Sequence, residues 1–234
     1  MTVKDYPPSE RPTWRLVGEE LLAAVAAGLL IPLGLSKDRR VTPRKELQRT
    51  VVLVHGWMAK RSTLLPMATY LRARGLKQQL YFSYRSGDGV EPAARALREH
   101  LRRNVRGGRI DLVCHSMGGL VARVYLQDLG GHRRVDNCIT ISTPHRGTYN
   151  SYWIPSRVGR ELRPDSPLLE RLNASMDSVG DVRFLSITGG SDNIVVPRIF
   201  ASHEDEVHLP DLGHIGVLFS PKVFKAVGDR LLEA

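Results

Sequence analysis

The feature that most constrains the fold is a serine between a predicted strand and a predicted helix, in residues 109–121. Residues 110–114 form a short apolar run after Gly107 and Gly108, and such a run is typical of a strand that is buried on both faces. The next letters read HSMGG, and apolar residues then recur at helical spacing. This order of strand, sharp turn and helix predicts that the Ser116 side chain projects above the edge of a sheet.

The turn also determines what the serine can do. The backbone N–H of Met117 and the helix N-terminus point to the place where negative charge develops when a serine attacks a carbonyl group. The pattern is G-x-S-x-G with one departure, because Cys114 stands where the first glycine is expected. Gly118 leaves room for the helix to pass close to the strand. We therefore interpret Ser116 as a candidate nucleophile, although the alternative is a serine in an ordinary glycine-rich turn.

Strands and helices alternate along residues 48–234. The runs bounded by turn residues predict strands at residues 51–54, 80–84, 110–114, 137–142, 182–188 and 206–209. Apolar residues at helical spacing predict helices at residues 63–74, 91–105, 120–129 and 223–232. Such alternation predicts an α/β fold, with a mostly parallel sheet of about six strands and helices on both faces. A length of 234 residues is typical of one main domain.

One interval, residues 144–180, interrupts the alternation. It is rich in proline and contains the apolar and aromatic residues Tyr149, Tyr152, Trp153 and Ile154. Loops of this length in a compact domain are usually lids or binding elements. We therefore expect a lid-like insertion whose four named residues bind substrate as an acyl-binding wall. The alternative is that the aromatic rings only pack on the sheet.

Residues 1–47 differ from the domain that follows them. Residues 1–13 are rich in proline and resemble a flexible tail, whereas residues 21–35 contain no charged side chain. The uncharged run is shorter than the ~20 residues that span a bilayer, and Pro32 interrupts it. Two glutamates directly before it argue against a secretory signal. Residues 14–35 are thus a candidate membrane-associated helix, or a helix packed on the domain's own surface.

The formal net charge of +10 suggests an anionic partner. No zinc-finger spacing, aromatic RNA-binding motif or phosphate-binding loop is present, so we expect no nucleic acid partner. An anionic membrane surface fits better, because a basic block follows the uncharged run and would hold the domain on the cytoplasmic side. The two cysteines lie in predicted strands, which favours buried free thiols and a reducing compartment. We therefore expect a cytoplasmic protein, attached to the inner face of the membrane if residues 14–35 insert.

A nucleophilic serine needs a histidine that takes its proton and an acid that orients the histidine. In doubly wound hydrolases the acid and then the histidine follow the serine, each on a loop at the carboxyl end of a strand. Asp192 follows the predicted strand at residues 182–188, and His214 follows the one at residues 206–209. The predicted catalytic residues are therefore Ser116, Asp192 and His214.

Other acids and histidines fit this order less well. Asp211 lies only three residues before His214, Asp181 precedes its strand, and Asp165 lies in the interval that interrupts the alternation. His115 adjoins the serine but points elsewhere on the turn. The remaining histidines precede the last predicted strand, lie within it, or stand at other unsuitable positions.

A second oxyanion donor is expected in the loop after the first strand of the domain. There the letters HGW place the backbone N–H of Trp57 opposite that of Met117. Each such donor typically contributes ~3 kcal/mol of transition-state stabilisation. We expect His55 to brace this loop rather than to transfer protons.

Five motifs occur in order over residues 50–232: VVLVHGW, DLVCHSMGGLVAR, ISTPHRGT, GGSDNIVVP and GHIG. Together they resemble bacterial triacylglycerol lipases and esterases of the α/β-hydrolase superfamily. The resemblance implies an α/β-hydrolase fold, the triad of Ser116, Asp192 and His214, and the oxyanion donors Trp57 and Met117. It also implies hydrolysis of carboxylic esters, often acylglycerols, without a cofactor or metal. The sequence departs from the family pattern in Cys114, the short lid-like interval and the N-terminal apolar segment.

We therefore predict a serine ester hydrolase of the lipase or carboxylesterase type, which acts on small-molecule ester or lipid substrates through an acyl-enzyme. A thioesterase, an amidase or an acyltransferase would use the same triad, so these alternatives stay open. A catalytically silent scaffold or lipid-binding protein is a further alternative. It is disfavoured because no member of the triad is missing from the sequence.

Overall fold

A computed structural model of the chain describes residues 11–30, 32, 49–196 and 205–233. Its centre is a six-stranded sheet with the strand order β2-β1-β3-β4-β5-β6, in which every pair of neighbours is parallel. The strands are β1 (Thr50–Val54), β2 (Gln79–Phe82), β3 (Ile110–His115), β4 (Val135–Ile141), β5 (Arg183–Gly189) and β6 (Asp205–Leu209). The predicted α/β class, with a mostly parallel sheet of about six strands, is confirmed.

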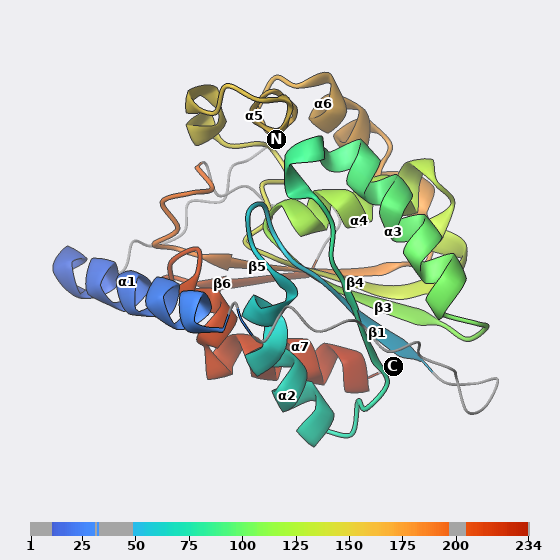
Figure 1. Ribbon diagram of the computed structural model, residues 1–234, viewed down its shortest axis with the longest axis horizontal. Helices are drawn as coiled ribbons and strands as arrows, with labels where there is room; N and C mark the ends of the chain where they lie inside the picture. The colour runs from blue at the N-terminus through green and yellow to red at the C-terminus, as the bar shows by residue number, and fades with distance from the viewer. Residues whose placement is uncertain (1–10, 31, 33–48, 197–204, 234) are drawn as a thin grey trace.

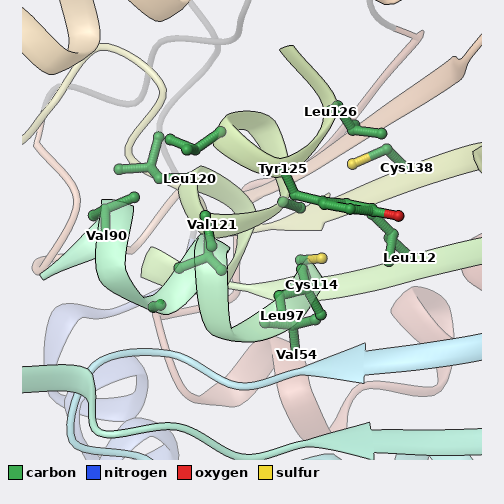
Figure 2. Packing of buried hydrophobic residues seen from close by; sticks show 14 of the residues in the cluster. Val54, Val90, Leu97, Leu112, Cys114, Leu120, Val121, Tyr125, Leu126 and Cys138 are labelled. Carbon is green, nitrogen blue, oxygen red and sulfur yellow. The ribbon is translucent and has the colours of Figure 1, made fainter. Parts of the chain in front are cut away.

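The central strands are buried on both faces. Every residue of β1 and β3 is buried, and this is why both read as apolar runs in the sequence. Cys114, which stands at the glycine position of the serine motif, packs among apolar side chains of α3 and α4 (Figure 2). Its side chain is small enough to fit between the strand and the helices, and Cys114 and Cys138 are both buried and form no disulfide.

Helices cover both faces of the sheet (Figure 1). One face carries α3 (Val90–Asn104) and α4 (Met117–Asp128), with α5 (Arg157–Glu161) and α6 (Pro167–Ala174) beyond them. The other face carries α2 (Leu65–Ala73) and α7 (Pro221–Leu232). Each face has its own apolar cluster, one around α3 and α4 and the other around α2 and α7. Burial of these two clusters fixes the layers of the domain.

The strand order reverses beside β1. The chain passes from β1 to the edge strand β2 and then returns to β3 on the other side of β1. In open α/β sheets, ligands bind outside the carboxyl ends of the strands at such a switch point. The loops that follow β1 and β3 meet there.

Short helices make up much of residues 144–180. They are η5 (Tyr149–Trp153), α5, α6 and η6 (Met176–Val179). The Ser166 hydroxyl accepts a hydrogen bond from the N–H of Leu169, and Pro167 stands at the first position of α6, so this helix begins with two standard start signals. The interval is an ordered insertion, and its function as a lid stays a prediction.

The helix α1 (Thr13–Leu29) covers most of the predicted segment at residues 14–35. It lies beside η7 (Gly216–Phe219), the short helix that precedes α7 (Figure 1). Residues 31 and 33–48 lie outside the described residues, and so does the expected boundary between residues 1–47 and 48–234. None of the described helices is long and apolar enough to cross a membrane.

Candidate active site

Ser116 lies at the sharp turn between β3 and α4. Its φ angle is 54°, in the left-handed region that disfavours any residue with a side chain. The turn forces α4 close to its neighbours: a Cβ atom on Gly118 would lie 2.7 Å from the carbonyl oxygens of Val54 and His55. A Cβ atom on Gly119 would lie 2.2 Å from Thr143 Oγ1. Glycine at these two positions therefore allows the turn that exposes the serine.

The three predicted catalytic residues come together at the carboxyl edge of the sheet. Ser116 Oγ lies 3.1 Å from His214 Nε2, and His214 Nδ1 lies 2.7 Å from Asp192 Oδ2. The residues follow β3, β5 and β6, and both Asp192 and His214 are buried. Of the acids considered from the sequence, Asp192 is the one whose carboxylate lies against His214 Nδ1.

The Asp192 carboxylate is held on both oxygens. Its Oδ1 accepts hydrogen bonds of 2.8 Å from the backbone N–H groups of Ile194 and Val195, while Oδ2 faces the ring of His214. Burial alone would raise the pKa of Asp192, but the neighbouring His214 and these hydrogen bonds outweigh it and lower that pKa. An ionised Asp192 accepts the Nδ1–H of His214, so Nε2 is left to accept the hydroxyl proton of Ser116.

His115 contacts the backbone of His214. Its Nε2 lies 3.0 Å from the backbone carbonyl oxygen of His214, and because a carbonyl oxygen only accepts, Nε2 carries the proton. Burial, together with the charge of His214, lowers the pKa of His115 to about 3. His115 is thus neutral near pH 7, and its Nε2–H is used in the hydrogen bond to the His214 backbone.

His55 braces the loop after β1. Its ring stacks on Tyr84 with 4.6 Å between ring centroids, and its Nδ1 lies 2.9 Å from the carbonyl oxygen of Gly56. The Tyr84 hydroxyl in turn donates to the His55 carbonyl oxygen over 2.8 Å. Burial lowers the pKa of His55, which keeps its ring neutral. These contacts agree with the expected bracing role.

The two expected oxyanion donors flank Ser116. A Cβ atom on Gly56 would lie 2.8 Å from Ser116 Cβ, so the backbone that leads to Trp57 passes directly against the serine. Met117 is the first residue of α4. Neither the Trp57 N–H nor the Met117 N–H donates to another acceptor within the residues that the structure describes. Their function as oxyanion donors stays a prediction.

A cavity of about 370 Å³ opens beside Ser116 and His214. Trp57, Met58 and Ile194 line it, and so does the cationic residue Lys60. Among the described residues no aspartate or glutamate lines it. The cavity therefore suits an uncharged or anionic molecule with a large apolar part.

The four residues predicted to bind substrate do not line this cavity. Tyr149, Tyr152 and Trp153 lie in η5 with Ile154 directly after it, and the Trp153 side chain is 86% exposed. Tyr152 donates its hydroxyl proton to Asp165 over 2.9 Å. Substrate binding by these four residues stays a prediction.

The sequence did not predict that α1 and the residues after His214 form one wall of the cavity. Ala24, Ala27 and Gly28 of α1 line it, and so do Ile215 and Leu218 after the catalytic histidine. The only available signal was the run of small residues in an otherwise apolar segment. That run does not tell which part of the fold the helix will cover.

No group of three or more histidine, cysteine, aspartate and glutamate residues is placed to hold a metal ion in the described ranges. The chemistry that this arrangement supports uses the serine, the histidine and the backbone N–H groups of the two loops.

A family profile matches well over half of the chain. The profile is described as "PGAP1-like alpha/beta domain" and matches residues 90–229. The matched range includes Ser116, Asp192 and His214, but it excludes Trp57 and α1.

Solved structures of lipases have a similar fold. Lipase B from Aspergillus fumigatus is 18% identical, with a TM-score of 0.67 over 79% of this chain and 52% of the other. The mature lipase BlEst2 from Bacillus licheniformis is 14% identical, with a TM-score of 0.61 over 84% of this chain and 96% of the other. Phospholipase PlaB from Legionella pneumophila is 20% identical, with a TM-score of 0.56 over 62% of this chain.

These matches confirm the expected α/β-hydrolase fold of the lipase and esterase type. The chain spans only 39% of the PlaB chain in its complex with thio-NAD and 52% of the Aspergillus lipase. Because all three identities are low, the fold is what these proteins share with this chain.

Proposed function

The chain belongs to the PGAP1-like alpha/beta domain family, and we propose that it is a serine hydrolase that cleaves carboxylic esters through an acyl-enzyme on Ser116. One observation carries the proposal: a continuous line of hydrogen bonds runs from Ser116 Oγ through the ring of His214 to Asp192. A histidine ring placed in this way can take a proton from the serine and return it to a leaving group.

In the first half of the reaction, Ser116 Oγ attacks the ester carbonyl carbon while its proton moves to His214 Nε2. Asp192 holds the Nδ1–H and stabilises the charged imidazole. The carbonyl electron pair moves to the oxygen, which the N–H groups of Trp57 and Met117 stabilise. When the tetrahedral intermediate collapses, the bond to the alcohol oxygen breaks. His214 gives that oxygen the proton, and an acyl-serine remains.

In the second half, water enters the place of the alcohol. His214 takes a proton from the water as its oxygen attacks the acyl carbon, and the same oxyanion donors stabilise the new intermediate. The bond to Ser116 Oγ then breaks, and His214 returns the proton to Oγ. The carboxylic acid leaves, and Ser116 and His214 return to their starting protonation states.

The apolar cavity favours esters with a hydrocarbon acyl group. Met58, Trp57 and Ile194 present carbon surface beside the serine, and burial of hydrocarbon there contributes ~25 cal/mol per Å² of surface removed from water. Acylglycerols and other acyl esters have this character. We propose them as the substrate class.

The test compares the wild type, Ser116→Ala and the surface control Ser178→Ala on p-nitrophenyl esters of increasing acyl length. We expect Ser116→Ala to lower kcat by on the order of 10⁴ to 10⁶ and Ser178→Ala to leave it unchanged. Turnover by Ser116→Ala at the wild-type rate would disprove the mechanism. Product analysis with a thioester and an added alcohol would reveal a thioesterase or an acyltransferase.

We also propose that α1 attaches the protein to an anionic membrane surface. Six large apolar side chains of this helix are exposed: Trp14, Val17, Leu21, Leu22, Val25 and Leu29. A basic block follows in the sequence, and the formal net charge is +10. Apolar insertion combined with attraction to anionic lipids holds such helices in the plane of the membrane.

Co-sedimentation with phosphatidylglycerol-rich vesicles tests this attachment. We expect the double substitution Leu22→Ser and Leu29→Ser to weaken binding tenfold or more, because both side chains are more than 70% exposed and would insert. Leu232→Ser, at the exposed end of α7, is the matched control and should bind like the wild type. If the wild type stays in the supernatant, the attachment is wrong.

A further inference from the structure

The helix α1 forms one wall of the cavity beside Ser116, although it lies outside the range that the family profile matches. It contributes Ala24, Ala27 and Gly28 to the lining. All three are small. Because residues three and four apart lie on one helix face, they form a single strip along the cavity.

The residues of α1 that line the cavity include no large side chain. Its large side chains Leu22, Val25 and Leu29 are exposed and do not line the cavity. Tight packing does not explain the glycine, since a Cβ atom added at Gly28 would meet nothing within 4 Å. The small residues thus leave open space in the cavity rather than closing a contact.

The helix is anchored to the loop that carries His214. Glu20 Oε1 accepts a hydrogen bond of 2.5 Å from the N–H of Ile215, and Oε2 accepts one of 2.9 Å from the N–H of Gly216. A Cβ atom on Gly213 would lie 2.3 Å from Glu20 Oε2, so the contact is a close one. These bonds place the small-residue strip at a fixed position relative to the reacting serine.

Resting on the ester hydrolysis proposed above, we propose that α1 is the wall against which the acyl chain lies. Ala24, Ala27 and Gly28 then determine the longest acyl chain that the site admits. At about 370 Å³, the cavity lies within the roughly 300–1,000 Å³ that is typical of small-molecule sites.

Two glycines of α1 provide a matched pair of substitutions. Gly28 lines the cavity and Gly18 does not, and a Cβ atom at either position meets nothing within 4 Å. Leucine favours the helix over glycine by roughly 0.8 kcal/mol, so neither substitution should disturb folding. In Gly28→Leu, the new side chain would occupy space that the acyl chain needs.

The first readout is kcat/KM for p-nitrophenyl esters from acetate to palmitate. Each methylene group that can no longer be buried in the cavity costs ~0.8 kcal/mol, or about fourfold in kcat/KM. We expect the ratio of long-chain to short-chain kcat/KM to fall at least tenfold in Gly28→Leu. Gly18→Leu should keep the wild-type ratio. Identical ratios in the two variants would overturn the proposal.

A second readout does not depend on turnover. Trp57 lines the cavity, so its fluorescence reports occupancy once Trp14→Phe and Trp153→Phe remove the other two tryptophans. Straight-chain fatty acids of increasing length are titrated into this protein with Ser116→Ala, with and without Gly28→Leu. We expect Gly28→Leu to shorten the longest acid that binds tightly.

The two readouts separate this proposal from ester hydrolysis. If no ester is hydrolysed but Gly28→Leu shortens the preferred fatty acid, the proposal that α1 is the acyl-binding wall stands and the proposal of ester hydrolysis is wrong. If esters are hydrolysed but Gly28→Leu matches Gly18→Leu in both assays, the proposal of the acyl-binding wall is wrong and the proposal of ester hydrolysis stands. Absence of both turnover and fatty acid binding would overturn both.

Discussion

At the scale of single residues, three separate contacts restrain His214. Asp192 holds Nδ1, Ser116 Oγ contacts Nε2, and His115 donates to the backbone carbonyl oxygen. A ring that is fixed in this way loses no further freedom when the serine proton moves. Such preorganisation is how a buried site stabilises charge that develops only during the reaction.

Replacement of Asp192 by asparagine tests this restraint. The N–H groups of Ile194 and Val195 select the amide oxygen, so the amide NH₂ would face His214 Nδ1. The ring would then carry its proton on Nε2 and could not accept one from Ser116. We expect Asp192→Asn to lower kcat by on the order of 10⁴ with little change in KM.

The control for this substitution is Asp165→Asn, in the insertion. Asp165 accepts the hydroxyl proton of Tyr152 and lies outside the cavity lining. Steady-state kinetics of both variants on one ester should show the loss for Asp192→Asn alone. A loss below tenfold for Asp192→Asn would mean that another acid orients His214.

Among the elements, the insertion at residues 144–180 is fastened to α4 by a buried arginine. Arg123 donates to the carbonyl oxygen of Leu172 over 2.7 Å and to Asn173 Oδ1 over 3.0 Å, and its side chain is fully buried. The insertion is thereby tied to the helix that begins directly after Ser116.

We expect Arg123→Met to lower the free energy of unfolding by about 2–4 kcal/mol, because the substitution breaks several buried hydrogen bonds to a charged group. Urea denaturation followed by circular dichroism measures this change. Arg102→Met on α3 is the matched control, since its side chain is exposed and bonds only to Glu99 among the described residues. Equal effects of the two substitutions would contradict the anchoring role.

A helix or strand can be predicted from the sequence when a local pattern of residues specifies it, and not when tertiary contacts determine its position. Fully buried strands such as β1 and β3 read as apolar runs, and the turn at Ser116 has its own glycine signature. The insertion helices α5 and α6 are short, with five and eight residues, so their periodicity is weak. The place of α1 over the cavity depends on tertiary contacts of Glu20, which no local pattern records.

For the molecule as a whole, one parallel sheet brings together residues that lie far apart in the chain. Ser116, Asp192 and His214 were predictable because the carboxyl ends of β3, β5 and β6 share one edge, and chain order then assigns their roles. The cavity wall was not predictable in this way, because it depends on which element covers that edge. The sequence therefore predicted which three residues meet at this edge, but not the surface that covers it.

The buried histidines predict how the stability of the whole molecule depends on pH. Burial lowers the pKa of His55, His115 and His145, and for His115 to about 3. Below about pH 6.5 the unfolded chain binds protons at these residues and the folded chain does not, so stability falls as the pH falls. Asp192, whose pKa is lowered, loses its contribution only below about pH 3.8.

We expect the free energy of unfolding to fall between pH 7 and pH 5, by about 2 kcal/mol for His115 alone. Urea midpoints at pH 7, 6 and 5 measure this change. Repeating the series at high salt controls for repulsion within a chain of net charge +10. A free energy that stays constant or rises towards pH 5 would show that these rings are not held neutral.

Covalent labelling of Ser116 gives the most direct test of the proposed acyl-enzyme chemistry. The native protein is incubated with an alkyl fluorophosphonate, digested and analysed by mass spectrometry, beside His214→Ala and the surface variant Ser178→Ala. We expect one alkylphosphonyl group on Ser116 in the wild type and in Ser178→Ala, and a much slower reaction in His214→Ala. An unlabelled Ser116, or labelling at an unchanged rate without His214, would contradict the proposed nucleophile and base.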